Sequence, residues 1–133
     1  MATHPKPLNE SLVRNLPDEG PVVMVNLLRM RSRSRDGDGT GWDAYTRYSR
    51  ATMKLIKARG GTVLWGGNGE GVAFGDAAKD RWDYVVLVQY PSRAAFLDMV
   101  TSPDYEAANI HRENGVEEHV ILASAETYSK FAG

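Results

Sequence analysis

The chain has 133 residues, of which 42% are hydrophobic and 25% are charged, a composition typical of one soluble domain. Sixteen lysines and arginines against seventeen acidic residues give a formal net charge of -1, which excludes a general attraction to nucleic acid or to an anionic membrane. The chain has no cysteine, which excludes disulfides, thiolate metal sites and a cysteine nucleophile.

The first residues, MATHPKPLNES, are polar and lack the apolar core of a secretory signal, and no stretch approaches 18 consecutive apolar residues. We therefore expect a cytoplasmic protein with neither a membrane nor a nucleic acid as partner. Residues 1–19 are expected to form an N-terminal leader, with a short helix over 9–16 that Asn9 caps and Pro17 ends. Residues 20–133 are expected to form one domain.

Strands are predicted where β-branched and aromatic residues run together, and helices where apolar residues recur every three or four positions behind a capping residue. The glycine-rich segment GGNGEG predicts a bulge, a kink or a hairpin within the second strand. In chain order, the predicted elements are a strand over 22–30, a helix over 42–59 capped by Thr40 or Asp43, a strand from 62 to 65 with a second part over 71–74, a strand over 82–90, a short helix capped by Ser92, a further helix from Pro103 to about Asn114, and a strand over 116–125.

This βαββαβ order predicts an α+β, ferredoxin-like domain, in which a four-stranded antiparallel sheet carries its helices on one face. The strands over 22–30 and 82–90 are apolar on both sides, whereas a sheet with one wet face alternates apolar and polar residues. A second copy of the chain is the simplest cover for the other face, so we expect a homodimer formed through that face. The alternative is that the N-terminal segment and the loops cover it.

Five segments of the domain read GPVVMVNLLRM, GWDAYTRYSRA, ARGGTVLWGG, WDYVVLVQYPSRAAFLDMVTSPDYEAA and HRENGVEEHVIL. Together they resemble a bacterial family of unknown function within the dimeric α+β barrel superfamily, over about residues 20–126. The resemblance implies a ferredoxin-like protomer that packs sheet against sheet with a second copy. It also implies the activities of that superfamily: cofactor-free monooxygenases, polyketide cyclases, muconolactone-type isomerases and haem-handling enzymes. A shared fold does not choose among these chemistries.

The first strand contributes two candidate binding residues, Asn26 and Arg29. Asn26 lies among apolar neighbours, and a buried amide must find hydrogen-bond partners or cost about 1–3 kcal/mol. It is either a polar anchor at the floor of a pocket or an amide bonded to the backbone at a bulge. The resemblance implies an asparagine at this place in the strand, which favours the anchor.

Aromatic residues form a second group of binding candidates. Tyr45 and Tyr48 stand three positions apart on the core side of the predicted helix, where their rings can line a cavity and their hydroxyls face a ligand. Trp65 is expected to shape the same site from the second strand. The alternative for each of them is plain core packing.

His111 and Arg112 form the third group, near the end of the last predicted helix. Histidine is the natural proton carrier near neutral pH and arginine can hold a carboxylate, so His111 is the catalytic candidate and Arg112 a substrate-binding one. The resemblance implies a pair of this kind here. The alternative is a basic pair favoured by the negative end of the helix dipole.

The chain has three histidines, His4, His111 and His119, and no helical histidine pair, so we expect no metal site and no cofactor. Two functions stay open. One is a cofactor-free enzyme, of isomerase, cyclase or monooxygenase type, that acts on a small organic acid or aromatic compound. The other is a non-catalytic small-ligand binding or accessory dimer. In a third interpretation the pocket is mere packing and Asn26 is a structural hydrogen-bond node.

Overall fold

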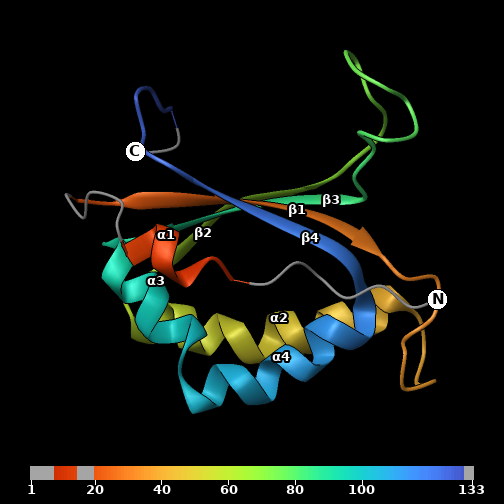
Figure 1. The fold of residues 1–133 in the computed structure, drawn as a ribbon, viewed down its shortest axis with the longest axis horizontal. Helices are drawn as coiled ribbons and strands as arrows, with labels where there is room; N and C mark the ends of the chain where they lie inside the picture. Colours follow the sequence, from red (N-terminus) through yellow and green to blue (C-terminus); the bar gives the residue numbers. More distant parts are fainter. Residues whose placement is uncertain (1–7, 15–19, 131–133) are drawn as a thin grey trace.

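The computed structural model describes residues 8–14 and 20–130 of the chain. Its four strands pair antiparallel in the order β2-β3-β1-β4, and the helices lie on one side of this sheet (Figure 1). The predicted βαββαβ order and α+β class are confirmed. The elements are α1 (Glu10–Arg14), β1 (Val22–Met30), α2 (Gly41–Ala58), β2 (Thr62–Asn68), β3 (Tyr84–Tyr90), α3 (Arg93–Val100), α4 (Pro103–Gly115) and β4 (Val116–Ser124).

The helices begin where side chains satisfy their first backbone N–H groups. Both predicted caps of α2 are used: the Thr40 hydroxyl accepts from the Asp43 N–H at 3.1 Å, and the Asp43 carboxylate accepts from the Thr40 N–H at 2.8 Å. Ser92 caps α3, as predicted, and Ser102 caps α4. None of the described helices combines the length and the hydropathy needed to cross a bilayer.

Alternation along β1 divides its side chains between two environments. Its even-numbered residues, including Met24 and Leu28, are buried toward the helices and form the core with apolar residues of β3, α2, α3 and α4. Its odd-numbered residues face the other side of the sheet. Both faces of this strand are therefore largely apolar. The even-numbered side packs on the helices, and the odd-numbered side faces away from them.

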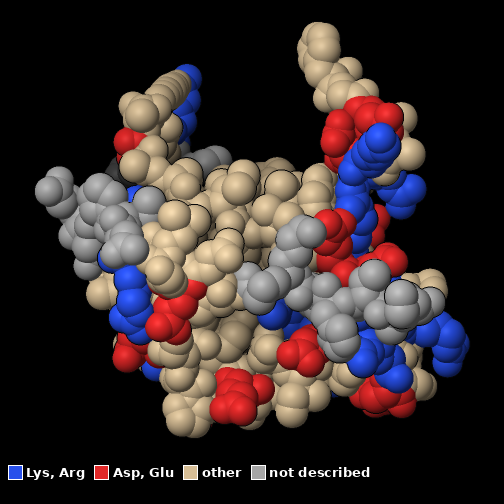
Figure 2. All heavy atoms as spheres, viewed as in Figure 1, with Lys and Arg blue, Asp and Glu red and all other residues tan. Residues whose placement is uncertain are grey.

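The face turned away from the helices is an apolar surface that no described helix covers. Leu122 of β4 and Trp65 of β2 are 54% and 47% exposed on it. Two segments rise beside this open face in Figure 1: residues 69–83 (green) and residues 125–130 (blue). Between them the surface in Figure 2 carries neither Lys or Arg nor Asp or Glu. Register places on this face Val23, Val25, Leu27, Trp65, Val85, Leu87, Val120 and Leu122.

The second strand differs from its prediction. It runs without interruption through Thr62–Asn68, with a bulge between Val63 and Trp65, and the expected second part over 71–74 is not a strand. Residues 69–83 instead form an arm that extends beyond the sheet (Figure 1). Gly66 and Gly67 are still paired with β3, and the glycines at 69 and 71 follow where β2 ends, because glycine is a weak strand former. Within the described residues the N-terminal helix is Glu10–Arg14, and positions 15–17, with the expected stop at Pro17, lie outside them.

Candidate functional site

A cavity of about 160 Å³ lies between the sheet and the helices. Apolar side chains form most of its wall, and its polar lining comes from hydroxyls, one amide and one imidazole. The lining residues are Met24, Asn26, Tyr45, Tyr48, Ser49, Thr52, Met53, Ile56, Val63, Tyr84, Val86, Val88, Tyr90, Phe96, Met99, Val100, Tyr105, His119 and Ile121. Mostly apolar walls with a few polar groups are typical of small-molecule sites.

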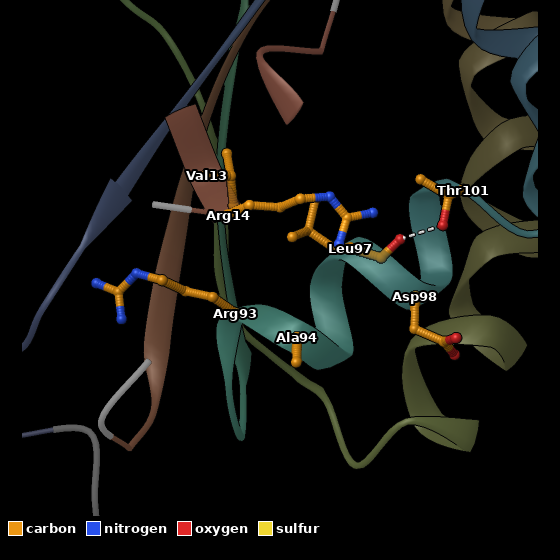
Figure 3. A pocket seen from close by; sticks show the side chains of 7 residues that line it. All are labelled: Val13, Arg14, Arg93, Ala94, Leu97, Asp98 and Thr101. Atoms are coloured by element: carbon orange, nitrogen blue, oxygen red, sulfur yellow. Dashed lines mark hydrogen bonds between the residues drawn. The ribbon is translucent and has the colours of Figure 1, made fainter. Parts of the chain in front are cut away.

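A second hollow of about 400 Å³ lies on the surface between α1 and α3 (Figure 3). Its charged groups already have partners: Arg14 pairs with Glu10 at 2.9 Å, and Asp98 pairs with Arg59 at 2.9 Å. In Figure 3 the guanidinium of Arg93 points away from the carboxylate of Asp98. The hollow therefore does not gather convergent polar groups, and the interlayer cavity is the better candidate site.

The floor of the cavity is a chain of hydrogen bonds through Asn26 and His119. Nε2 of His119 lies 2.9 Å from Oδ1 of Asn26, and the Asn26 amide nitrogen donates to the carbonyls of Met24 and Val86 at 3.1 and 3.3 Å. Nδ1 of His119 lies 3.1 Å from the guanidinium of Arg112. A guanidinium can only donate, so Nδ1 accepts, the ring proton sits on Nε2, and that N–H donates to Asn26.

The same surroundings hold His119 neutral. Burial, and after it the positive charge of Arg112, lowers the pKa of His119 to about 3. At neutral pH this imidazole carries no charge and its acceptor nitrogen is occupied by Arg112. His119 is therefore suited to orient groups at the cavity floor and is a poor proton acceptor there.

Five tyrosines also line the cavity: Tyr45, Tyr48, Tyr84, Tyr90 and Tyr105. The hydroxyls of Tyr48 and Tyr105 lie 2.8 Å apart, and the ring of Tyr45 packs against those of Tyr48 and Tyr84 with centroids 5.8 and 5.9 Å away. Burial raises the pKa of Tyr45 and of Tyr48 above the usual value, which keeps both phenols protonated. Among the described residues, the Tyr45 hydroxyl has no hydrogen-bond partner.

The sequence matches the model of a family described as domain of unknown function (DUF1330) over residues 38–125. The chain belongs to this family. Its fold is similar to that of RPA0582, a protein of unknown function from Rhodopseudomonas palustris, with 32% identity and a TM-score of 0.85 over 96% of this chain and 100% of that one. Methylated RPA0582 is similar at 34% identity and the same TM-score, over 98% and 99% of the two chains.

More distant solved structures share only the fold. A dimeric ferredoxin-like protein of unknown function from Thermobifida fusca is 19% identical, with a TM-score of 0.52 over 84% of this chain and 97% of that one. A putative antibiotic biosynthesis monooxygenase from Caulobacter crescentus is 16% identical, with the same TM-score over 86% and 97%. No curated protein matches this sequence. The expected family of unknown function and its ferredoxin-like fold are thus confirmed.

Three of the residues predicted from the sequence lie together in the cavity of this DUF1330 domain: Asn26, Tyr45 and Tyr48. Arg112 does not line the cavity but contacts His119, which does. His111, its neighbour in α4, is half-buried and is not part of the lining. The roles assigned to these residues stay predictions.

Trp65 and Arg29 lie on the open face of the sheet, away from the cavity. Trp65 pairs with Leu87, whose side chain faces away from the helices. Arg29 forms an ion pair with Glu118, and its guanidinium carbon lies 4.2 Å from the ring centroid of Trp82. In this position Arg29 fixes the arm of residues 69–83 to the sheet.

Sequence reasoning considered His119 only as a metal ligand and did not single out Tyr84 or Tyr105. Alternation along β3 carries a signal for Tyr84, because residues 84, 86, 88 and 90 share the helix-facing side. The position of His119 follows only from the pairing of β4 with β1, which the sequence does not state. No group of three or more His, Asp or Glu side chains in the described ranges is arranged to hold a metal ion.

Proposed function

We propose that this DUF1330 domain binds one small organic molecule per protomer, in the cavity between the sheet and the helices, and that it does so as a homodimer. The observation that carries the binding proposal is the cavity itself, apolar in its walls and polar at the Asn26–His119 floor. Protein interiors are close-packed, so a cavity of about 160 Å³ with a few convergent polar groups leaves room for an occupant.

The dimer proposal rests on the open face. Its apolar side chains come from all four strands, and two of them are about half exposed. A contiguous apolar surface of this kind is rare on a monomer, and a self-complementary contact between two copies would bury it. The Thermobifida fusca protein of this fold is described as dimeric, which agrees with the proposal.

Binding is tested by calorimetry and thermal shift with single-ring organic compounds on the full chain. A ligand at about 100 times its dissociation constant adds roughly 2.7 kcal/mol to the free energy of unfolding. Ser49 lines the cavity from α2, so Ser49→Phe should fill it and abolish the shift. Arg50→Phe places the same side chain at an exposed position of the same helix and should leave binding intact. Equal binding by both variants would show that the ligand binds outside this cavity.

Self-association is tested by light scattering on the eluting protein. Leu122→Asp puts a charge on the open face and should yield a monomer. Ile110→Asp is the matched control, because Ile110 is an equally exposed apolar residue on α4, in the helix layer. A dimer that survives Leu122→Asp but not Ile110→Asp would place the interface on the helices.

A cofactor-free enzyme is the second candidate, favoured by the fixed Asn26–His119 pair at the cavity floor. The fold shared with the Caulobacter crescentus protein supports the same reading. The experiment is mass spectrometry of a bound compound after aerobic incubation with the wild type and with His119→Leu. Turnover that His119→Leu loses while binding persists would establish catalysis. An unchanged compound leaves binding as the function.

A further inference from the structure

We propose that the cavity takes uncharged, single-ring compounds that carry a hydroxyl group, such as simple phenols, and that it rejects carboxylates of the same size. This inference rests on the proposed binding function and names its ligand class. It follows from three properties of the lining: its charge, its unused hydrogen-bonding groups and its volume.

The lining contains no Lys, Arg, Asp or Glu. Its titratable groups are His119 and the tyrosines, and the protein keeps acid and base alike neutral: the pKa of His119 falls to about 3, and the pKa values of Tyr45 and Tyr48 rise. Burial is the largest cause of these shifts and disfavours both a cation and an anion, whereas the charge of Arg112 favours an anion at Tyr48 as a smaller effect. A carboxylate that entered would lose its hydration without a charged partner, at a cost of several kcal/mol.

Arg112 is the cation nearest the floor, and it is already engaged. Its Nε donates to Oδ1 of Asn109 at 2.5 Å, and its terminal nitrogen donates to Nδ1 of His119 at 3.1 Å. The imidazole thus stands between the guanidinium and the cavity. A ligand carboxylate would have to displace His119, which would leave a buried imidazole nitrogen without a partner.

The hydrogen bonds left for a ligand suit a hydroxyl group. Both nitrogens of His119 and the amide nitrogen of Asn26 are occupied, so the floor offers only the second lone pair of Asn26 Oδ1, which requires a donor. The Tyr45 hydroxyl has no partner among the described residues and can donate or accept. A phenol hydroxyl donates and accepts, whereas an ether or a carboxylate only accepts.

Size limits the ligand to one ring. An apolar cavity of about 150 Å³ in another protein holds benzene, and the cavity here measures about 160 Å³. Aromatic and branched side chains line it, so a ring packs against them without a further void. At the packing density of protein interiors, about 0.74, a fused two-ring compound fits this volume less well than a single ring.

The test is calorimetry at pH 7 with 4-methylphenol, toluene, benzamide, benzoate and 1-naphthol. We expect 4-methylphenol to bind at least tenfold more tightly than toluene, benzamide at least tenfold more tightly than benzoate, and 1-naphthol more weakly than 4-methylphenol. Tyr45→Phe removes one hydroxyl with the ring retained, and should weaken 4-methylphenol binding but leave toluene unchanged. Ser49→Phe should abolish binding of all five.

Two results would overturn the inference, and they differ. Benzoate binding as tight as that of benzamide, abolished by Ser49→Phe, would refute the ligand class and leave the proposed binding function standing. No binding of any of the five compounds, or binding that Ser49→Phe does not change, would refute both. If Ser49→Phe does not fold, Thr52→Leu fills the same wall from the next turn of α2 and decides the question.

Discussion

Nε2 of His119 lies 2.9 Å from Oδ1 of Asn26, although 93 positions separate the two residues. Both side chains are nearly inaccessible to solvent, at 5% and 9% exposure. The pair exists only when β4 is paired with β1 in the observed register, in which Leu28 faces His119 and Asn26 faces Ile121. It therefore reports on the correct assembly of the sheet as well as on the cavity.

Removal of both partners should destabilise the fold by less than the sum of the two single removals. Asn26→Leu leaves the His119 N–H without an acceptor, whereas His119→Leu leaves Arg112 without an acceptor and Asn26 Oδ1 without a donor; each should cost about 1–3 kcal/mol. In the double variant we expect a coupling energy of about 0.5–3 kcal/mol, measured by urea unfolding. Strictly additive costs would show that the hydrogen bond contributes nothing.

Acid should destabilise the protein through His119. The unfolded chain protonates this imidazole near pH 6.5, whereas the folded protein holds its pKa at about 3, so the unfolded state binds more protons between these values. The stabilising effect is complete above pH 6.5 and is lost as the pH falls. From pH 7.5 to pH 5 we expect a loss of about 2 kcal/mol, at ~1.4 kcal/mol per pH unit below 6.5.

His119→Gln is the control for this pH dependence, because a glutamine amide can bond to both Asn26 and Arg112 but does not titrate. Chemical denaturation at the two pH values should show a smaller loss for the variant than for the wild type. Parallel losses would mean that other groups dominate the acid response.

Arg112 should act on the imidazole tautomer. In the wild type, nitrogen-detected NMR of the histidine ring should show the proton on Nε2, because Nδ1 accepts from Arg112. Arg112→Met removes both the donor and the charge, so the pKa of His119 should rise but stay below 6.5, since burial is the larger cause of its depression. A proton on Nδ1 in the wild type would contradict the assigned hydrogen-bond chain.

Much of the fold could be predicted from local patterns, and the site only in part. Caps and apolar runs located the strands and helices, because these signals act within a few residues. The face on which a strand residue lies depends on register, and a bulge reverses it. The sequence predicted a bulge, a kink or a hairpin at the glycines, whereas the structure has a bulge between Val63 and Trp65, which turns Trp65 from the cavity side to the open face.

A similar argument explains why Arg112 contacts the cavity floor and His111 does not. Neighbouring residues on a helix point about 100° apart, so only one of an adjacent pair can face the sheet. The sequence pointed to this basic pair, but only Arg112 contacts a cavity residue. The imidazole that lines the cavity belongs to His119, seven positions later. The pairing of β4 with β1 places His119 at the cavity, and no local sequence pattern predicts that pairing.

The contact between α2 and α4 should not tolerate a methyl group at Gly115. A Cβ there would lie 2.5 Å from the carbonyl oxygen of Gly41 and 2.8 Å from Cβ of Ala44. Gly115→Ala should therefore lower the free energy of unfolding by about 1–3 kcal/mol in urea denaturation. Gly71→Ala, where a Cβ meets nothing within 4 Å, should stay within about 0.5 kcal/mol. Equal effects would refute a close helix–helix approach.

Arg29 should hold the arm and leave the cavity untouched. Its Nε donates to the Arg81 carbonyl at 2.7 Å, and it also contacts Glu118 and the Lys79 carbonyl. Arg29→Met should speed amide hydrogen exchange in residues 76–83, because these anchors are lost. Ligand affinity should not change. A loss of affinity would instead return Arg29 to the binding site, where the sequence had suggested it.

Helix α4 ends at Gly115 and strand β4 begins at Val116, with no connecting residue between them. The end of the helix therefore determines which residues of β4 face the cavity. One inserted residue after Gly115 would turn His119 from the cavity to the open face, away from Arg112 and Asn26. The arm of residues 69–83 carries no such constraint. Differences in chain length among members of the family should gather in the arm and be absent between Arg112 and His119.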